Sequence, residues 1–256
     1  MKNYVESQFN QIKNLPLFAK ISEDELHKIL KNAHIKNCQK NEILFSKDDK
    51  ILSFYIVLSG AVKLLISNEE GQEAILQIAK LGDFIGDLFS KTFIADAQII
   101  DNSLILAIPA EKFQESLQQN LQFAVNILKE ISAKNRSFIN QAAYLKIGTA
   151  QQKVGQLLLK SAFKKEGKKG EEINLDCDKK TIASYLGIRS ETFSRILKKL
   201  ENEGEITIKK NKMILLKENS LCNYCDGEIS AKCDKHKSSI CLQNHSSSAT
   251  LSKNFH

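Results

Sequence analysis

Short apolar runs separated by turns fill the first part of the chain after residue 40. The runs are Ile43–Phe45, Phe54–Leu58, Ala61–Ile66, Ala74–Ile78 and Leu104–Ile108. The turn signals between them are Lys47-Asp48-Asp49, Ser59-Gly60, Glu69-Glu70-Gly71 and Leu81-Gly82-Asp83. Many short strands joined by glycine-containing turns predict an antiparallel roll or barrel. Before them, residues 22–33 predict a helix, with Ser22 as its N-cap and acidic residues in its first turn.

A long helical pattern follows Pro109. Apolar residues recur in steps of three and four over 25 residues, or about 37 Å of helix, with a single asparagine among them. The members of this seam are Leu121, Ala124, Leu128, Ile131, Asn135, Phe138, Ala142 and Leu145. The pattern predicts a homodimer helix in which Asn135 fixes the register; the alternative is a helix whose seam is core of its own domain. Gly148 ends the helix.

The segment after Gly148 contains a helix-turn-helix pattern. Residues 151–163 form an amphipathic helix, and residues 179–187 form a short helix ended by its glycine. After a two-residue turn, Ser190 caps a helix that runs to Glu203, and residues 206–216 indicate a β-hairpin. Helix, turn, second helix and hairpin predict a winged helix-turn-helix, whose second helix enters the major groove of DNA.

The charge agrees with this division. Residues 1–147 hold 17 basic and 17 acidic residues, whereas residues 148–217 hold 16 basic and 9 acidic residues. The last 39 residues hold four of each, so the whole net charge of +7 lies in the middle segment. One module therefore suits a polyanion, although a solvated lysine-rich surface would give the same count.

The segment Ile182-Ala-Ser-Tyr-Leu-Gly-Ile-Arg-Ser-Glu-Thr-Phe-Ser-Arg-Ile-Leu-Lys-Lys-Leu-Glu-Asn-Glu-Gly204 closely resembles the DNA-binding signature of the CRP/FNR family of bacterial transcription regulators. The runs Phe54-Tyr-Ile-Val-Leu-Ser-Gly-Ala-Val-Lys63, Glu70-Gly-Gln-Glu73 and Gly82-Asp-Phe-Ile-Gly-Asp-Leu-Phe89 resemble that family's effector domain. The resemblance covers roughly residues 10–217.

This resemblance implies an α+β chain. An antiparallel, cyclic-nucleotide-binding-like β-roll (a jelly roll) would occupy residues 1–118 and sense a small signal. A dimerisation helix would follow at 119–147, the C-terminal winged helix-turn-helix at 148–217, and a cysteine-rich tail at 218–256. The resemblance also implies a homodimer that binds a palindromic operator in double-stranded DNA and contacts RNA polymerase.

The family's FNR/DNR-like branch reads bases with a Glu-x-x-Ser-Arg pattern, which is Glu191, Ser194 and Arg195 here. Arginine can bind guanine, glutamate can accept from cytosine, and serine can contact thymine, which implies a TTGA(T/C) half-site. An exposed Glu191–Arg195 ion pair is the alternative. Further candidate DNA contacts are Arg189, Ser190 and Thr192, with Lys179, Lys180, Lys198 and Lys199 as phosphate contacts.

The predicted effector domain differs from that of the family's cyclic-nucleotide branch. That branch needs an arginine for the cyclic phosphate, but here Asp87 stands in the glycine loop, Phe93-Ile-Ala-Asp-Ala-Gln98 follows, and no arginine precedes Arg136. We therefore expect no tight cAMP binding. The oxygen-sensing cysteine group near the N-terminus is also missing. The DNR-type branch responds to nitric oxide through haem, for which His27 and His34 are candidate ligands or else surface histidines.

The tail carries four of the six cysteines. Its spacing, Cys-x2-Cys-x7-Cys-x2-His-x4-Cys, suits a metal site made of Cys222, Cys225, Cys233, His236 and Cys241. Zinc would make the tail structural, an iron–sulfur cluster would make it a redox sensor, and a disordered tail with incidental cysteines is the third possibility. Cys38 and Cys177 are expected to be structural.

Class and location follow from composition. The chain of 256 residues is 42% hydrophobic and 26% charged, with no apolar stretch near the ~20 residues that span a bilayer and no secretory signal. We expect a cytoplasmic protein without a membrane partner. The sequence shows no paired carboxylates and no nucleophile–base pair of the kind that would indicate an enzyme. The rival functions are a cyclic-nucleotide-binding regulatory subunit without DNA function, a catalytic metalloprotein whose tail holds the active metal, and a regulator with an unrelated small-molecule effector.

Overall fold

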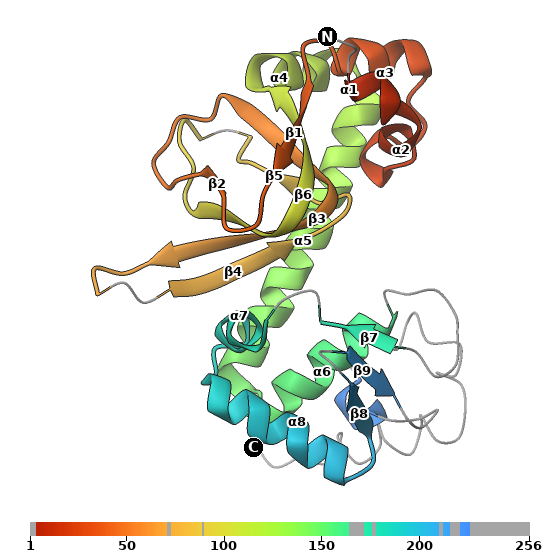
Figure 1. Ribbon diagram of the computed structural model, residues 1–256. Helices are drawn as coiled ribbons and strands as arrows, with labels where there is room; N and C mark the ends of the chain where they lie inside the picture. Colours follow the sequence, from red (N-terminus) through yellow and green to blue (C-terminus); the bar gives the residue numbers. More distant parts are fainter. Residues whose placement is uncertain are drawn as a thin grey trace, which may run out of the picture. The chain divides into compact units, whose positions relative to one another are not determined.

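The computed structural model describes residues 4–70, 73–88, 90–163, 172–175, 178–209, 212–215 and 221–225. The chain divides into two compact units, Met1–Gln141 and Ala142–His256 (Figure 1). Each unit has its own hydrophobic core.

Short helices open the first unit: α1 (Tyr4–Ser7), α2 (Phe9–Lys13), η1 (Pro16–Phe18) and α3 (Glu23–Ile29). Ser22 caps α3 as expected, and it forms a reciprocal capping box with Glu25. The helix ends four residues before the predicted end at residue 33. Asn32 adopts a left-handed conformation with φ of 65°, which turns the chain into the strand that begins at His34.

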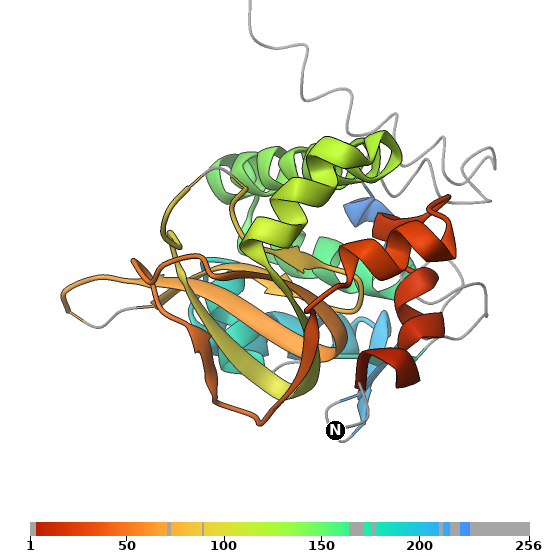
Figure 2. The same ribbon diagram turned by 90° about the horizontal axis from the view of Figure 1, so that it is seen from above.

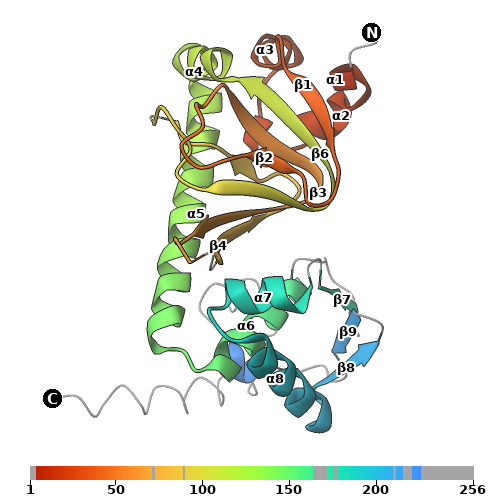
Figure 3. The same ribbon diagram turned by 60° about the vertical axis from the view of Figure 1, so that its left-hand side comes forward.

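The strands of this unit form one six-stranded antiparallel sheet that curls into a roll (Figure 3). They are β1 (His34–Cys38), β2 (Ile43–Phe45), β3 (Ser53–Ser67), β4 (Glu73–Ala79), β5 (Phe84–Ile85) and β6 (Asp96–Pro109). The order is β1-β6-β3-β4, with β2 on β6 and β5 on β3. The predicted fold class, an α+β chain with an antiparallel roll, is confirmed.

One predicted turn is wrong. Ser59-Gly60 does not separate two strands but lies inside the 15-residue strand β3. The pairing of β3 with β6 shifts register there, and Gly60 has φ of 79°. A side chain at Gly60 would come within 2.2 Å of the Ser103 hydroxyl on β6, so the glycine allows a close approach of two strands in a bulge.

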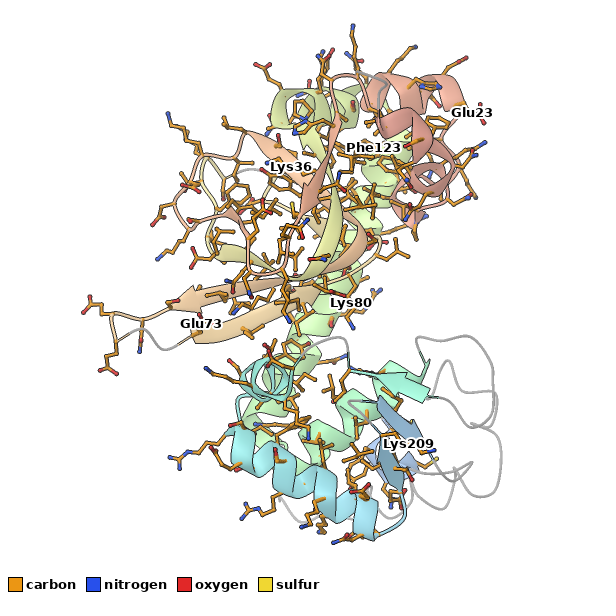
Figure 4. The ribbon with its side chains drawn as sticks, viewed as in Figure 1. Glu23, Lys36, Glu73, Lys80, Phe123 and Lys209 are labelled. Carbon is orange, nitrogen blue, oxygen red and sulfur yellow. The ribbon has the colours of Figure 1, made fainter. Side chains whose placement is uncertain are left out.

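Two clusters of apolar side chains fill the first unit. One lies inside the roll and contains Phe45, Tyr55 and Phe93. The other lies between the roll and the helices and contains Phe54 and Phe123 (Figure 4). Seen from above, α1–α3 lie beside the strands and do not enter the roll (Figure 2). The interior of the roll is therefore filled by side chains of the strands and of the loop residue Phe93, and not by helices.

Two helices follow the roll, α4 (Ala110–Gln119) and the long α5 (Leu121–Ile147). Phe123, Asn126 and Ile127 of α5 are buried in the first unit. The Asn126 amide donates hydrogen bonds to the carbonyl oxygens of Leu17 (3.1 Å) and Ala19 (2.8 Å). One face of α5 is thus fixed to the N-terminal segment.

The second unit contains α6 (Ala150–Phe163), β7 (Glu172–Asn174), α7 (Lys179–Tyr185), α8 (Ser190–Asn202), β8 (Ile206–Lys209), β9 (Lys212–Leu215) and η2 (Cys222–Tyr224). The strands form a sheet in the order β7-β9-β8, so the hairpin is present and gains a strand, β7, that the sequence did not indicate. The winged helix-turn-helix architecture is confirmed.

Candidate DNA-binding surface

Helix α8 has one buried and one exposed face. Phe193, Ile196, Leu197 and Leu200 pack into the core of the second unit, each less than a tenth exposed. Glu191, Ser194, Arg195 and Lys198 are all exposed; Ser194 and Arg195 lie three and four residues after Glu191, and Lys198 lies four and three residues after them, so the four share one face. The apolar face anchors the helix, and the polar face can meet a ligand with its side chains.

The start of α8 differs in one detail from the sequence expectation. Its N-cap is Arg189, with φ −72° and ψ 147° and no side-chain cap, and Ser190 is already its first helical residue. The Ser190 hydroxyl instead lies 3.5 Å from a carboxylate oxygen of Glu191. The backbone of Gly187, with φ of 62°, makes the turn between the two helices.

Helix α7 supports this turn. The Asp178 carboxylate accepts a hydrogen bond of 2.7 Å from the Thr181 amide and caps the helix. Lys179 and Lys180 in its first turn are exposed. The Ile188 amide donates to the Ala183 carbonyl across the turn, at 3.0 Å. This bond closes the C-terminus of α7 and fixes the turn, while the two helices pack on each other through their apolar faces.

The electrostatics of the exposed face favour a polyanion. Among the ion pairs that the structure describes, none joins Glu191 to Arg195, so the alternative of an intrahelical pair gains no support. Lys198 is exposed at the same face. Lys199 differs, because its ammonium donates to the Gln151 side-chain oxygen at 2.9 Å and lies 3.7 Å from Glu203. Only one of the four predicted phosphate-contact lysines is thus held by neighbouring side chains within the described residues.

The seam predicted along α5 is exposed. The exposed fraction is 80% for Leu121, 64% for Leu128, 41% for Ile131 and 45% for Phe138. Asn135 and Ala142 are exposed, Ala124 is half-buried, and the side chain of Leu145 lies outside the described residues. The alternative, that this seam is core of its own domain, is wrong for these four large residues. Ile139, 60% exposed, joins the apolar face and was missed because it lies outside the heptad positions.

The interior of the roll is occupied by its own side chains. The rings of Phe45 and Phe93 stack with centroids 3.6 Å apart. In the segment that the family resemblance makes the phosphate site, the chain has Ala95 and Asp96, and the Asp96 carboxylate accepts a hydrogen bond from the Lys47 amide (2.8 Å). Asp87 accepts from the hydroxyl of Ser90 at 2.6 Å. A carboxylate in each of these two segments disfavours a phosphate there.

One lysine links α5 to the roll. Lys134 donates to the backbone carbonyl of Phe84, and its ammonium lies 5.6 Å from the centre of the Phe84 ring. Burial lowers the pKa of Lys134, and the nearby carboxylates of Asp83 and Glu130 oppose that shift. The charge is thus held at the edge of the apolar cluster that contains Phe84.

The candidate haem and thiol residues are scattered in the first unit. His27 lies exposed on α3 with its ring stacked on Phe9, at a centroid distance of 4.4 Å. His34 is exposed at the start of β1, and neither histidine belongs to the roll interior. Cys38 is buried, and burial raises the pKa of its thiol, which suits a structural residue.

Only part of the predicted metal site can be placed. Cys222 and Cys225 are half-buried at the two ends of η2, and Cys233, His236 and Cys241 lie outside the described residues, as does Cys177. Within the described ranges no three metal-ligating side chains come together. A pair at x2 spacing could supply two of the four ligands of a four-coordinate metal site.

Sequence reasoning missed that the start of the tail packs on the second unit. Leu221 is 2% exposed, and Tyr224 and Cys225 pack against the same core. The Tyr224 hydroxyl accepts a hydrogen bond from the Gln151 side-chain amide at 2.8 Å. The apolar Leu221 and the aromatic Tyr224 are the sequence signals that indicate this packing. The cysteines beside them are also typical of a metal site, and only that interpretation was made.

Two family models match the chain. Residues 35–120 match the cyclic nucleotide-binding domain, and residues 152–224 match the Crp-like helix-turn-helix domain. The second match includes Leu221–Tyr224, in agreement with their packing. No helix within the described ranges is long and apolar enough to cross a membrane.

Curated relatives cover most of the chain. The transcriptional activator protein anr of Pseudomonas aeruginosa is 25% identical over 84% of this chain and 89% of its own length. The fumarate and nitrate reduction regulatory protein of Escherichia coli is 25% identical over 73% of this chain and 75% of its own length. Among solved structures, FixK2 from Bradyrhizobium japonicum has the same fold, with a TM-score of 0.70, 21% identity, and coverage of 76% of this chain and 98% of its own.

Proposed function

Because the chain belongs to the CRP/FNR family of transcription regulators, which are not enzymes, we propose that it binds a TTGA(T/C)-type palindrome as a homodimer. It responds to a small redox or gas signal, oxygen or nitric oxide, and not to cAMP. Its partners are the double-stranded operator, a second copy of the chain and RNA polymerase.

The exposed face of α8 carries this proposal. Arg195 has two parallel N–H groups for O6 and N7 of guanine, and Glu191, one turn earlier, can accept from the amino group of the paired cytosine. Ser194 lies beside Arg195 and suits a neighbouring thymine. Lys179, Lys180 and Lys198 are exposed and suit phosphates, which position the helix without reading sequence.

The dimer follows from the exposed seam of α5. Large apolar side chains at Leu121, Leu128, Ile131 and Phe138 lose contact with water when two copies pair. A two-fold dimer presents two copies of α8, and an inverted palindrome has the same symmetry. Asn135, exposed in the middle of the seam, suits a role in fixing the register.

The signal site has two candidates. The tail ligands Cys222 and Cys225, with Cys233, His236 and Cys241, would hold zinc or an iron–sulfur cluster, and a cluster would supply redox chemistry. His27 and His34 are the candidate haem ligands, and their exposed positions outside the roll interior make this the weaker candidate. The relative named for fumarate and nitrate reduction, two redox reactions, favours a redox signal.

Operator titration of Arg195→Ala tests the recognition proposal. We expect a loss of about 1–3 kcal/mol on the TTGA(T/C) palindrome and relaxed discrimination at the guanine, because only the arginine reads that base. Lys198→Ala is the control, and it should weaken binding to operator and mutated operator alike. Unchanged affinity and discrimination in Arg195→Ala would contradict the assignment, and a wild-type protein that binds no such palindrome would contradict the function.

A further inference from the structure

The turn at Leu221–Cys225, which we call the docked turn, is held on the second unit by a hydrogen bond as well as by apolar contacts. Leu221 is 2% exposed although it adopts a left-handed conformation with φ of 64°, which is unfavourable for a leucine. Its amide donates to the Glu205 carboxylate at 3.0 Å. Burial and a charge-assisted hydrogen bond therefore stabilise Leu221 in a backbone conformation that is intrinsically unfavourable for leucine.

Tyr224 lies at the other end of the docked turn, against α6. A side chain at Gly155 would come within 2.3 Å of the Tyr224 ring, so the ring lies directly on the helix backbone. One turn earlier on α6, the Gln151 amide nitrogen donates to the Tyr224 hydroxyl at 2.8 Å. The tyrosine is thus fixed by ring packing and by its hydroxyl.

Gln151 continues this chain of contacts to the recognition helix. Its side-chain oxygen accepts from the Lys199 ammonium at 2.9 Å. An ammonium can only donate, so the lysine requires the oxygen of the amide to face it and leaves the nitrogen for Tyr224. Tyr224, Gln151 and Lys199 therefore form one hydrogen-bonded chain from the docked turn to α8.

We propose that Tyr224 is a positioning residue that orients Lys199 for a DNA phosphate, an inference that rests on the proposed DNA-binding function. Lys199 remains half-exposed, with 54% of its side chain open to solvent. The Lys199 ammonium has three N–H donors, and Gln151 accepts from one of them. The Glu203 carboxylate lies beyond hydrogen-bond distance, at 3.7 Å. A lysine side chain has about 2 kcal/mol of rotamer entropy, and a lysine that is already oriented loses less of it on binding.

A double-mutant cycle on operator affinity tests this chain. Tyr224→Phe keeps the ring on Gly155 and removes the hydroxyl, and we expect about threefold to tenfold weaker binding, the range of one net hydrogen bond. In the Lys199→Gln background the same substitution should have no further effect. Gln151→Met breaks the chain at its other link and should reproduce the loss without adding to it.

The salt dependence separates positioning from structure. Lys199→Gln should lower the slope of log K against log salt by about 0.9, the value for one phosphate contact, whereas Tyr224→Phe should leave the slope unchanged. Tyr185→Phe is the matched control, because it removes another hydroxyl from the same core, where burial raises the pKa of that tyrosine. It should leave affinity unchanged.

Two results would overturn the inference. One is an operator affinity that Tyr224→Phe does not change, and the other is an equal loss with and without Lys199. Both are measured relative to wild-type protein on operator and on scrambled DNA. Wild-type protein that binds neither would instead contradict the proposed function, so the two failures are distinguishable.

Discussion

A single glycine decides whether the docked turn can lie on α6. Alanine favours a helix interior over glycine by about 1 kcal/mol, so Gly155 in the middle of a 14-residue helix has a cost. The ring of Tyr224 occupies the place of the missing side chain. Packing of the tail on the second unit therefore outweighs helix propensity at this residue.

Gly155→Ala should lower the stability of the second unit despite the better helix former. The new methyl group overlaps the Tyr224 ring, and overpacking of this kind typically costs about 1–3 kcal/mol. Thermal unfolding of the full chain checks the expectation, with Gly155→Ala combined with Tyr224→Ala as the control. If the combined variant is no more stable than Tyr224→Ala alone, or the single variant is more stable than wild type, the docking of Tyr224 on α6 is contradicted.

At the scale of elements, α5 has two different faces. Phe123, Asn126 and Ile127 pack on the first unit, while Leu128 and Ile131 are exposed. An apolar stripe of this length on an otherwise polar helix surface marks an interaction site. The helix can therefore be fixed to its own unit and still offer exposed apolar residues to a partner.

Leu128→Glu should convert the dimer to a monomer. Two carboxylates at facing seam positions would be desolvated and would repel each other. Sedimentation equilibrium at micromolar concentration measures the change, and Ser137→Glu, an exposed residue outside the seam, adds the same charge as a control. A wild-type monomer, or a Leu128→Glu dimer as tight as wild type, would refute the assignment of the interface.

The elements differ in how far the sequence predicts them. Helix α8 is local, because its turn glycines and its apolar spacing are both short-range signals, and its bounds agree to within one residue. Gly60 is the opposite case. A positive φ is equally typical of a hairpin turn and of a bulge, and only the approach of Ser103 from β6, far along the chain, decides between them.

In the candidate site, too, local features can be predicted from the sequence and long-range contacts cannot. The exposed face of α8 follows from helical spacing, so Glu191, Ser194 and Arg195 could be placed together from the sequence. The contact of Gln151 with both Tyr224 and Lys199 could not, because it joins three segments that are separated by about 50 and 25 residues. Contacts of this kind depend on tertiary packing and have no local pattern.

At the scale of the whole molecule, charge and candidate ligands are unevenly divided. The first unit up to residue 141 holds the roll, and the second holds the excess of basic over acidic residues and the tail cysteines. A signal received at the tail would therefore arise in the same unit that binds DNA. A signal received in the roll would have to reach DNA through α5.

Metal analysis of protein purified without oxygen distinguishes these routes. We expect bound metal that is lost in Cys222→Ser and Cys225→Ser but kept in Cys38→Ser, because Cys38 is buried alone in the roll. Iron with sulfide and a brown absorption band that bleaches in air would identify a redox cluster, and zinc without colour would identify a structural site. Metal-free protein would exclude the tail site, and a Soret band after haem addition would place the sensor in the first unit.

The long pairing of β3 with β6 also governs how the chain acquires its structure. Tyr55 pairs with Ala107, so this ladder closes a loop of about 50 residues, whereas α7 and α8 meet across a short turn. Non-local pairing of this kind slows folding, because loop-closure entropy is lost before the contacts form. On the ribosome the roll emerges first, and we expect its β3–β6 ladder to form more slowly than the contact between α7 and α8. Helices α7 and α8 can therefore contact each other while the strands of the roll, made before them, have not yet all paired.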